Sequence, residues 1–305
     1  MLIIGSHVSY GKHGILDSVE EALSYNANTF MFYTGAPTNT IRKDIDKDIV
    51  NQAHELMKKN NIDINNVVCH APYIVNLANK SDLDKWQFSI DFIKKELIRC
   101  DELGINKMVL HPGNAVKISK EEGINNIIEA LNIVLDGTTN CQILLETMAG
   151  KGSECGSSIE EISNIINGIK NNKQIGVCLD TCHLNDAGYD MNDFDKYLDD
   201  FSKNIDLKMI KCLHLNDSKN ERGSHKDRHA NLGIGTIGFD NLLNIAYNDR
   251  LKNVPKILET PYIGETDDSK ERIYPPYKYE IEMLRNKKYN KDYMKNIREE
   301  YGRQK

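Results

Sequence analysis

Short runs of apolar residues alternate with longer amphipathic stretches along the whole chain. Eight such runs occur, at Leu2–Ser6, Thr29–Tyr33, Val67–His70, Lys107–His111, Gln142–Glu146, Ile175–Asp180, Met209–His214 and Pro255–Glu259. Because their apolar residues are nearly continuous rather than alternating, the runs are typical of strands buried on both faces of a parallel sheet. The pattern predicts a succession of parallel strand–helix units.

The stretches between the runs carry helical signals. Apolar residues at positions 15, 19, 22 and 23 have the spacing of one helix face, and this helix is predicted to end near Asn26. The stretch 83–103 is followed by Gly104, a residue type that often ends helices. At 158–170, Ser158 precedes Glu161 by three residues, which is the spacing of a capping box.

Eight strand–helix units favour a closed α/β structure, the (β/α)8 TIM barrel, over an open sheet. We find no linker, low-complexity tract or internal repeat that would indicate a second domain. Residues 1–288 are therefore predicted to form one catalytic barrel, followed by a basic C-terminal extension at 289–305.

The composition is that of a globular protein, with 40% hydrophobic and 28% charged residues among 305. No apolar run approaches the roughly 18 residues of a membrane span, and the N-terminus lacks the basic segment of a secretory signal. The seven cysteines form no CxxC pairs, which suits reduced thiols. We therefore expect a cytoplasmic monomer that does not bind membranes.

The formal net charge is −6, from 39 Lys and Arg against 45 Asp and Glu. Taken alone, this balance argues against a nucleic-acid-binding protein, because binding phosphates normally requires surplus cations. The last 21 residues differ, with eight Lys or Arg against Asp292, Glu299 and Glu300. This basic tail is interpreted either as a source of salt-sensitive DNA affinity or as a packed helical end with solvated lysines.

Side chains that can bind metals stand where six of the eight apolar runs end. They are His70, His111, Glu146, Asp180, His214 and Glu259, and short motifs further along add His183, Asp227 and His229. In a barrel the carboxyl ends of all strands meet at one mouth, where active sites lie. The nine side chains are therefore predicted to converge on one site.

The chemistry of these nine residues indicates a metal centre. A single His or Glu at a strand end is usually a solvated loop entrance, but nine in phase with the strand–helix period are not expected by chance. Five imidazoles with four carboxylates suit Zn²⁺, with Mn²⁺ or Fe as alternatives, and their number fits two or three ions with a bridging carboxylate. His7 is a candidate for orienting a ligand, and Cys69, Cys178, Cys182 and Cys212 are predicted to be small buried filler.

Eight strings of the sequence resemble the endonuclease IV type of apurinic/apyrimidinic endonuclease. They are GSHVS (5–9), HAPYIVNL (70–77), LHPG (110–113), LLET (144–147), LDTCH (179–183), HLNDSK (214–219), DRHANLGIG (227–235) and LETP (258–261). They follow the family's order over nearly the whole chain from residue 5 to 261. The resemblance implies a three-zinc (β/α)8 enzyme of DNA repair that cuts duplex DNA on the 5′ side of an abasic site, leaving a 3′-hydroxyl and a 5′-deoxyribose phosphate.

The resemblance also implies a role for each of the nine residues. The first zinc would be bound by His70, His111 and Glu146, and the third by His183, Asp227 and His229. Glu146 would bridge to the second zinc, whose other ligands would be Asp180, His214 and Glu259. Glu146 and Glu259 are expected to be catalytic, the first by bridging two ions and the second by positioning the attacking hydroxide.

The DNA contacts implied by the resemblance lie on loops that leave the strands. In the family these loops bend the duplex and extrude the abasic nucleotide, and Tyr73 and Ile74 match positions that push into the DNA. The loop 34–43 lacks a basic residue where one subgroup inserts an arginine, and Arg42 is the candidate replacement. Three Zn²⁺ would bring the formal charge from −6 to about zero and concentrate positive charge at the mouth.

Two other functions would also use such a barrel. A sugar isomerase or epimerase would typically need two metals, mostly carboxylate ligands and a proton shuttle, and the set of His183, Asp227 and His229 argues against it. A non-catalytic, damage-binding barrel would use its metals structurally, but structural zinc sites are usually rich in Cys and none of the nine residues is Cys. The sequence therefore favours the nuclease.

Overall fold

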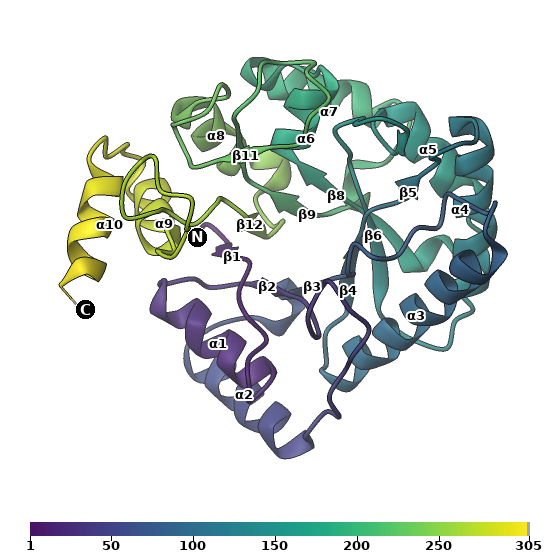
Figure 1. The fold of residues 1–305 in the computed structure, drawn as a ribbon, viewed down its shortest axis with the longest axis horizontal. Coiled ribbons are helices and arrows are strands. Elements are labelled where there is room, and N and C mark those ends of the chain that lie inside the picture. Colours follow the sequence, from purple (N-terminus) through teal and green to yellow (C-terminus); the bar gives the residue numbers. More distant parts are fainter. Residues whose placement is uncertain (304–305) are drawn as a thin grey trace.

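The computed structural model describes residues 1–303, which form a barrel of eight parallel strands (Figure 1). The strands are β1 (Ile4–Ser6), β2 (Met31–Phe32), β3 (Val68–His70), β4 (Lys107–Leu110), β6 (Gln142–Glu146), β8 (Ile175–Asp180), β9 (Ile210–His214) and β12 (Lys256–Leu258). Each strand pairs with its neighbours in chain order, and β12 pairs with β1. A parallel bridge between His7 and Met31 joins β1 to β2, so the predicted closed barrel is confirmed.

Helices follow the strands and cover the outside of the barrel (Figure 1). They are α1 (Ile15–Ser24), α2 (Lys47–Lys59), α3 (Leu83–Glu102), α4 (Lys120–Val134), α5 (Ile159–Gly168), α6 (Thr181–Ala187), α7 (Phe194–Ser202), α8 (Phe239–Ala246), α9 (Tyr277–Asn286) and α10 (Tyr293–Gly302). Two short antiparallel ribbons lie in the loops after the strands: β5 (Gly113–Asn114) pairs with β7 (Glu154–Cys155), and β10 (Asp217–Ser218) with β11 (His229–Ala230). Among the described helices, none has both the length and the apolar content to cross a bilayer.

Local sequence signals set the helix ends as predicted, with one difference. Gly104, just beyond α3, adopts a φ of 75°, a left-handed conformation that glycine tolerates best. The Ser158 Oγ accepts a hydrogen bond from the Glu161 N–H at 3.2 Å and caps α5. The Glu161 carboxylate accepts from the N–H groups of Gly156 and Ser157 instead of Ser158, so only half of the predicted capping box forms.

A compact apolar layer fills the inside of the barrel. It consists of Met31, Val68, Val109, Leu144, Cys178, Cys212 and Ile257, all fully buried. Each of them stands two residues before Tyr33 or one of the six strand-end polar residues. Because side chains on a strand alternate between its two faces, residues two apart point to the same side. The polar strand ends therefore project above a dry apolar floor.

The C-terminal segment packs against the barrel as a helical end. On α10, the side chains of Tyr293 and Ile297 are fully buried, and the Tyr293 hydroxyl donates to the Leu232 carbonyl at 3.3 Å. Arg298 donates to the Gly264 carbonyl and forms an ion pair with Asp267. Residues 304 and 305 of the predicted extension lie outside the described residues, and a division of the chain at residue 288 stays a prediction.

Candidate metal centre

The barrel brings all nine predicted metal ligands to the carboxyl ends of its strands. Their ligand atoms fall into overlapping groups whose members lie within 4.8 Å of one another. One group contains His70, His111 and Glu146, and a second contains Glu146, Asp180, His214 and Glu259. These two groups have the membership that the family resemblance implies for the first and second metals.

Glu146, the last residue of β6, lies where the groups meet. Its Oε2 is 3.2 Å from the Nε2 of His70 and 3.0 Å from the Nε2 of His111. Its Oε1 is 2.9 Å from the Nδ1 of His214, which also lies 3.0 Å from the Oε2 of Glu259. One carboxylate therefore faces two separate sets of ligands, which is the geometry that a bridging ligand requires.

The three residues predicted to bind the third metal lie close together but do not form a group of their own. The Asp227 Oδ1 lies 3.0 Å from the His183 Nε2 and 3.6 Å from the His229 Nε2. The ligand atoms group Asp180 with both histidines, and Cys182 with Asp227 and His229. The structure thus brings the three predicted residues into contact and adds two neighbours, of which Cys182 had been predicted only as filler.

Backbone carbonyls fix the orientation of three histidines. The Nδ1 atoms of His70, His183 and His229 lie 2.6, 2.8 and 3.2 Å from the carbonyl oxygens of Ala71, Thr147 and Glu259. An Nδ1–H that donates to a carbonyl leaves Nε2 as the free lone pair, and metal-binding histidines are commonly held in this way. In His70 and His229, Nε2 is the atom that faces the other candidate ligands, whereas in His183 the Nε2 faces Asp227 and the Nδ1 also lies 3.5 Å from the Glu146 Oε1.

Asn216 and Asp186, which the sequence did not indicate, form hydrogen bonds with three of the acidic candidate ligands. The Asn216 Nδ2 donates to the Asp180 Oδ2 at 2.7 Å, and its Oδ1 accepts from the Glu259 N–H at 2.8 Å. The Asp186 Oδ2 accepts from the Asp227 N–H at 2.9 Å. Asn216 and Asp186 lie within or just after the strings HLNDSK and LDTCH, but only the folded barrel shows which candidate ligands they contact.

His7 supports Glu259 from the other side. Its Nδ1 lies 3.4 Å from the Glu259 Oε1, and its ring packs against Tyr33 with the centroids 4.5 Å apart. Tyr33 in turn packs against His70 at 5.2 Å. This arrangement agrees with the prediction that His7 orients a ligand.

The charges of the site favour anionic carboxylates and raise the pKa of His111, His183 and His214, whereas burial lowers the pKa of His70. Burial opposes the charge of Glu146, but the neighbouring His214 and His111 outweigh it and hold the pKa of this carboxyl well below its usual range. Burial likewise opposes the charge of His183, but Asp180 and Asp227 raise the pKa of its imidazole well above the usual value. The carboxylates thus need positive charge at the centre of the site, which metal ions would supply while displacing protons from the histidines.

An unsatisfied nitrogen tests whether the residues fit metal ions. The His229 Nε2 is buried and has no hydrogen-bond partner among the described residues, although it faces Asp227 and Asp180. A buried polar atom without a partner is costly unless a water or an ion satisfies it. Together with a donor set of imidazoles and carboxylates, this atom indicates that the residues fit divalent metal ions.

The three predicted DNA contacts occupy different environments. Tyr73 lies on the loop after β3 with 55% of its surface exposed, and Ile74 is partly buried against the core. The Arg42 Nε donates to the buried Glu96 at 2.9 Å, and its Nη1 donates to the Asn39 and Ile41 carbonyls. Arg42 is therefore committed to its own loop in this structure, and its insertion into DNA stays a prediction that would require these bonds to break.

The fold and the site together define a class, the TIM barrels that gather imidazoles and carboxylates at the strand ends. Residues 19–287 match a family described as xylose isomerase-like TIM barrel. The chain is 49% identical over 302 residues to the probable endonuclease 4 of Bacillus licheniformis, which covers 98% of this chain and 100% of the relative. The chain therefore belongs to the endonuclease IV family of apurinic/apyrimidinic endonucleases, which are DNA-cleaving hydrolases.

Solved structures agree with this membership. Endonuclease IV from Thermus thermophilus matches with a TM-score of 0.76 and 28% identity, covering 93% of this chain and 97% of that one. A D-tagatose 3-epimerase-like protein matches with a TM-score of 0.65 and 18% identity over 97% and 99% of the two chains, which shows the shared fold alone. The resemblance identified in the sequence is confirmed, and the isomerase alternative rests on fold only.

Proposed function

We propose that this endonuclease hydrolyses the phosphodiester on the 5′ side of an abasic site in duplex DNA, leaving a 3′-hydroxyl and a 5′-deoxyribose phosphate. The observation that carries the proposal is the convergence of nine predicted ligands around Glu146 in a barrel of the endonuclease IV family. Three metal ions are proposed, zinc at most positions, with Mn²⁺ or Fe compatible with one.

The residues would hold the ions as three connected sets. The first set is His70, His111 and Glu146, the second Glu146, Asp180, His214 and Glu259, and the third His183, Asp227 and His229. When bound, such ions lower the pKa of an attacking water and neutralise the phosphoryl oxygens. Asp180 lies near the His229 Nε2 at 3.7 Å and so connects the second set to the third.

Glu259 is proposed to orient the attacking water. Its Oε2 faces His214 at 3.0 Å and its Oε1 faces His7 at 3.4 Å, while Asn216 holds its backbone N–H. The positive charge of His214 outweighs burial and keeps the pKa of the Glu259 carboxyl well below its usual range, so the group is an anion at neutral pH. An anchored anion can accept a proton or a hydrogen bond from water in a fixed direction.

Several features beside the ligands suit a DNA backbone. Lys226 and Arg228 are exposed on both sides of Asp227, where they can contact phosphates.

A hollow of about 430 Å³ next to the site is lined by His7, Tyr33, Tyr262 and other residues. Tyr73 packs edge-on at 6.5 Å against Tyr33, which lines this hollow and packs against the proposed ligand His70. We propose that Tyr73 and Ile74 enter the gap that an extruded nucleotide leaves.

Elemental analysis of the folded protein tests the metal part of the proposal. We expect about three ions per chain, mostly zinc, and fewer in a His111→Ala variant, because this residue belongs to one set only. A His13→Ala variant is the matched control, since this exposed histidine contacts Asp17 and not the nine residues. One ion or none in the undamaged wild-type protein would contradict the trinuclear assignment.

A further inference from the structure

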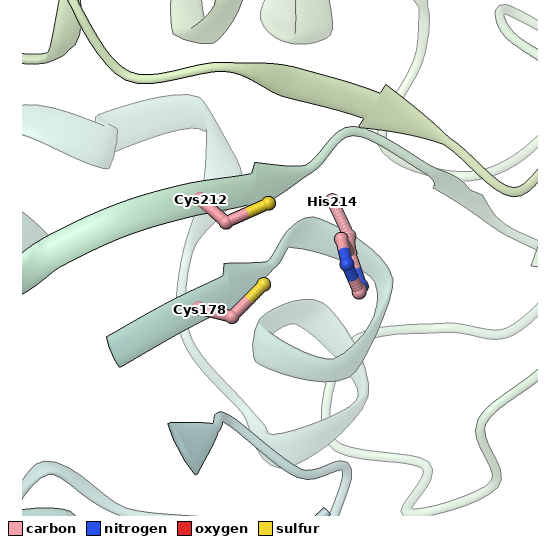
Figure 2. A group of neighbouring side chains, drawn as sticks. All are labelled: Cys178, Cys212 and His214. Atoms are coloured by element: carbon pink, nitrogen blue, oxygen red, sulfur yellow. The ribbon is translucent and has the colours of Figure 1, made fainter. Parts of the chain in front are cut away.

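Two cysteine side chains lie directly below His214 inside the barrel. Cys178 on β8 and Cys212 on β9 are paired in register on neighbouring parallel strands. Their sulfur atoms and a ring nitrogen of His214 all lie within 4.8 Å of one another. Figure 2 shows both sulfur atoms directed toward the imidazole ring. The three groups therefore converge on one point in the barrel floor.

The surroundings of this thiol pair are dry and apolar. Cys178 and Cys212 are fully buried, and Val109, Leu144 and Ile257 are among the apolar side chains of the same inner layer. Apart from their contacts with one another and with His214, the thiols make one weak hydrogen bond among the described residues, from the Cys178 Sγ to the Leu179 carbonyl at 3.8 Å. The thiols are thus close to one another without strong partners.

One of the two ring nitrogens of His214 has no hydrogen-bond partner among the described residues. Its Nδ1 faces the carboxylates of Glu146 and Glu259, whereas its Nε2 is fully buried and has no hydrogen-bond partner in the described chain. A buried ring nitrogen without a partner is uncommon and points to an atom that can accept a ligand. This observation does not depend on the proximity of the two thiols.

We infer that Cys178, Cys212 and His214 form a binding site for a soft divalent metal ion, which lies below the mouth and shares only His214 with the nine predicted ligands there. Thiolate sulfur prefers soft ions, whereas the imidazole and carboxylate mouth suits zinc and harder ions. Binding would release the two thiol protons, and two thiolates with one divalent cation form a neutral unit. Neutrality matters here because an uncompensated charge in an apolar floor would be strongly destabilising.

The site would compete with the metal centre for His214. This consequence rests on the proposed function, in which His214 completes the second metal set. A neutral imidazole has only one free lone pair, so an ion bound to the sulfur atoms and to Nε2 leaves the ring proton on Nδ1, and His214 cannot then bind the ion above. A soft metal ion bound at this site would thus inactivate the nuclease.

Titration of the zinc-loaded protein with Cd²⁺ tests the site directly. The measurement is the ultraviolet charge-transfer absorption of cadmium bound to thiolates, which imidazoles and carboxylates do not give. We expect the wild-type absorption to saturate at one Cd²⁺ per chain and to be lost in a Cys178→Ser, Cys212→Ser variant. A Cys100→Ser, Cys141→Ser variant is the matched control, because these two thiols are equally buried but lie outside the group. It should keep the absorption.

An unchanged absorption in the Cys178→Ser, Cys212→Ser variant, or none in the wild type, would overturn the inference. Cadmium-113 NMR of the wild-type protein needs no variant and removes any dependence on folding of the mutants. We expect a resonance in the range of sulfur-coordinated cadmium, and resonances only in the nitrogen and oxygen range would also overturn it. Failure of the proposed function would appear differently, as absence of abasic-site cleavage by the zinc-loaded wild type in assays without cadmium.

Discussion

Glu146 shows how much chemistry one strand-end residue can carry. Its two oxygens face His70 and His111 on one side and His214 on the other, at 2.9 to 3.2 Å. The carboxylate stays anionic in a fully buried position only because these imidazoles surround it. Removing the charge of one such residue should therefore affect turnover far more than folding.

A Glu259→Gln variant should keep the fold and lose most of its turnover. The amide removes the negative charge that holds His214 and His7 and that we propose to orient water. Loss of roughly two or more orders of magnitude in kcat is the scale observed for groups of this kind. The loss in kcat is measured by steady-state kinetics on an abasic duplex, and circular dichroism is the control for folding. Cleavage near the wild-type rate would move this role to another residue.

A Tyr73→Ala, Ile74→Ala variant should bind metals normally and lose its preference for abasic over intact duplex. Tyr73 is exposed beside the ligands, and inserted apolar side chains offset the cost of about a few kcal/mol for opening a base step. Phe88→Ala is the matched control, because Phe88 is an exposed aromatic residue on α3. Competition binding with the two duplexes measures the preference. Survival of the preference in the double variant would assign the wedge to other residues.

The sequence predicted which ligand residues meet, because strand ends share a mouth in any parallel barrel. It could not predict the bonds that hold them, since these cross between strands far apart in the chain. Asn216, for example, connects Asp180 to Glu259. The sequence could not predict the hydrogen bond of Arg42 for the same reason, because its partner Glu96 lies 54 residues away.

At the scale of elements, helix α9 is hydrogen-bonded to the loops that carry two of the candidate ligands, His229 and Glu259. Its Glu280 is fully buried and accepts hydrogen bonds from Thr260, Asn231 and the Leu232 N–H. Thr260 follows Glu259, and Asn231 lies two residues after His229. One carboxyl group thus ties together the loops after β9 and β12.

A Glu280→Gln variant should remove a pH dependence of stability. Burial raises the pKa of Glu280 to about 7, despite the hydrogen bonds from its neighbours. Because the folded protein holds this proton more tightly than the unfolded chain, the contribution to stability is full below about pH 4.5 and is lost as the pH rises toward 7. The free energy of unfolding is measured with urea at pH 5 and at pH 8. Between these two pH values, the free energy of the variant relative to the wild type should rise by roughly 2 to 3 kcal/mol. A difference between variant and wild type that does not change with pH would contradict the assignment.

The order of strands and helices followed from the apolar pattern, but the small elements did not. The observed β2 spans only Met31–Phe32 within the predicted run Thr29–Tyr33. The ribbons β5–β7 and β10–β11 were not predicted, because each consists of two-residue strands with no pattern of their own. Such pairs form only once the barrel has brought their loops together.

At the scale of the whole molecule, the proposed metal ions at the mouth of the barrel explain how a chain with a net negative charge acts on DNA. The chain carries a formal charge of −6, yet it belongs to a family of DNA-cleaving hydrolases. Three bound divalent ions would compensate this charge where the phosphate binds, with Lys226 and Arg228 beside them. On this proposal, both the binding and the cleavage of DNA depend on the metal ions.

Incubation of the protein with an end-labelled duplex that contains a single abasic analogue tests this account most directly. The purified protein, the same protein after chelation, and the chelated protein with zinc restored are compared on this duplex and on an intact one. We predict a single cut on the 5′ side of the abasic analogue with a 3′-hydroxyl end, lost on chelation and recovered with zinc. Cleavage that survives complete metal removal, or equal cutting of the intact duplex, would contradict it.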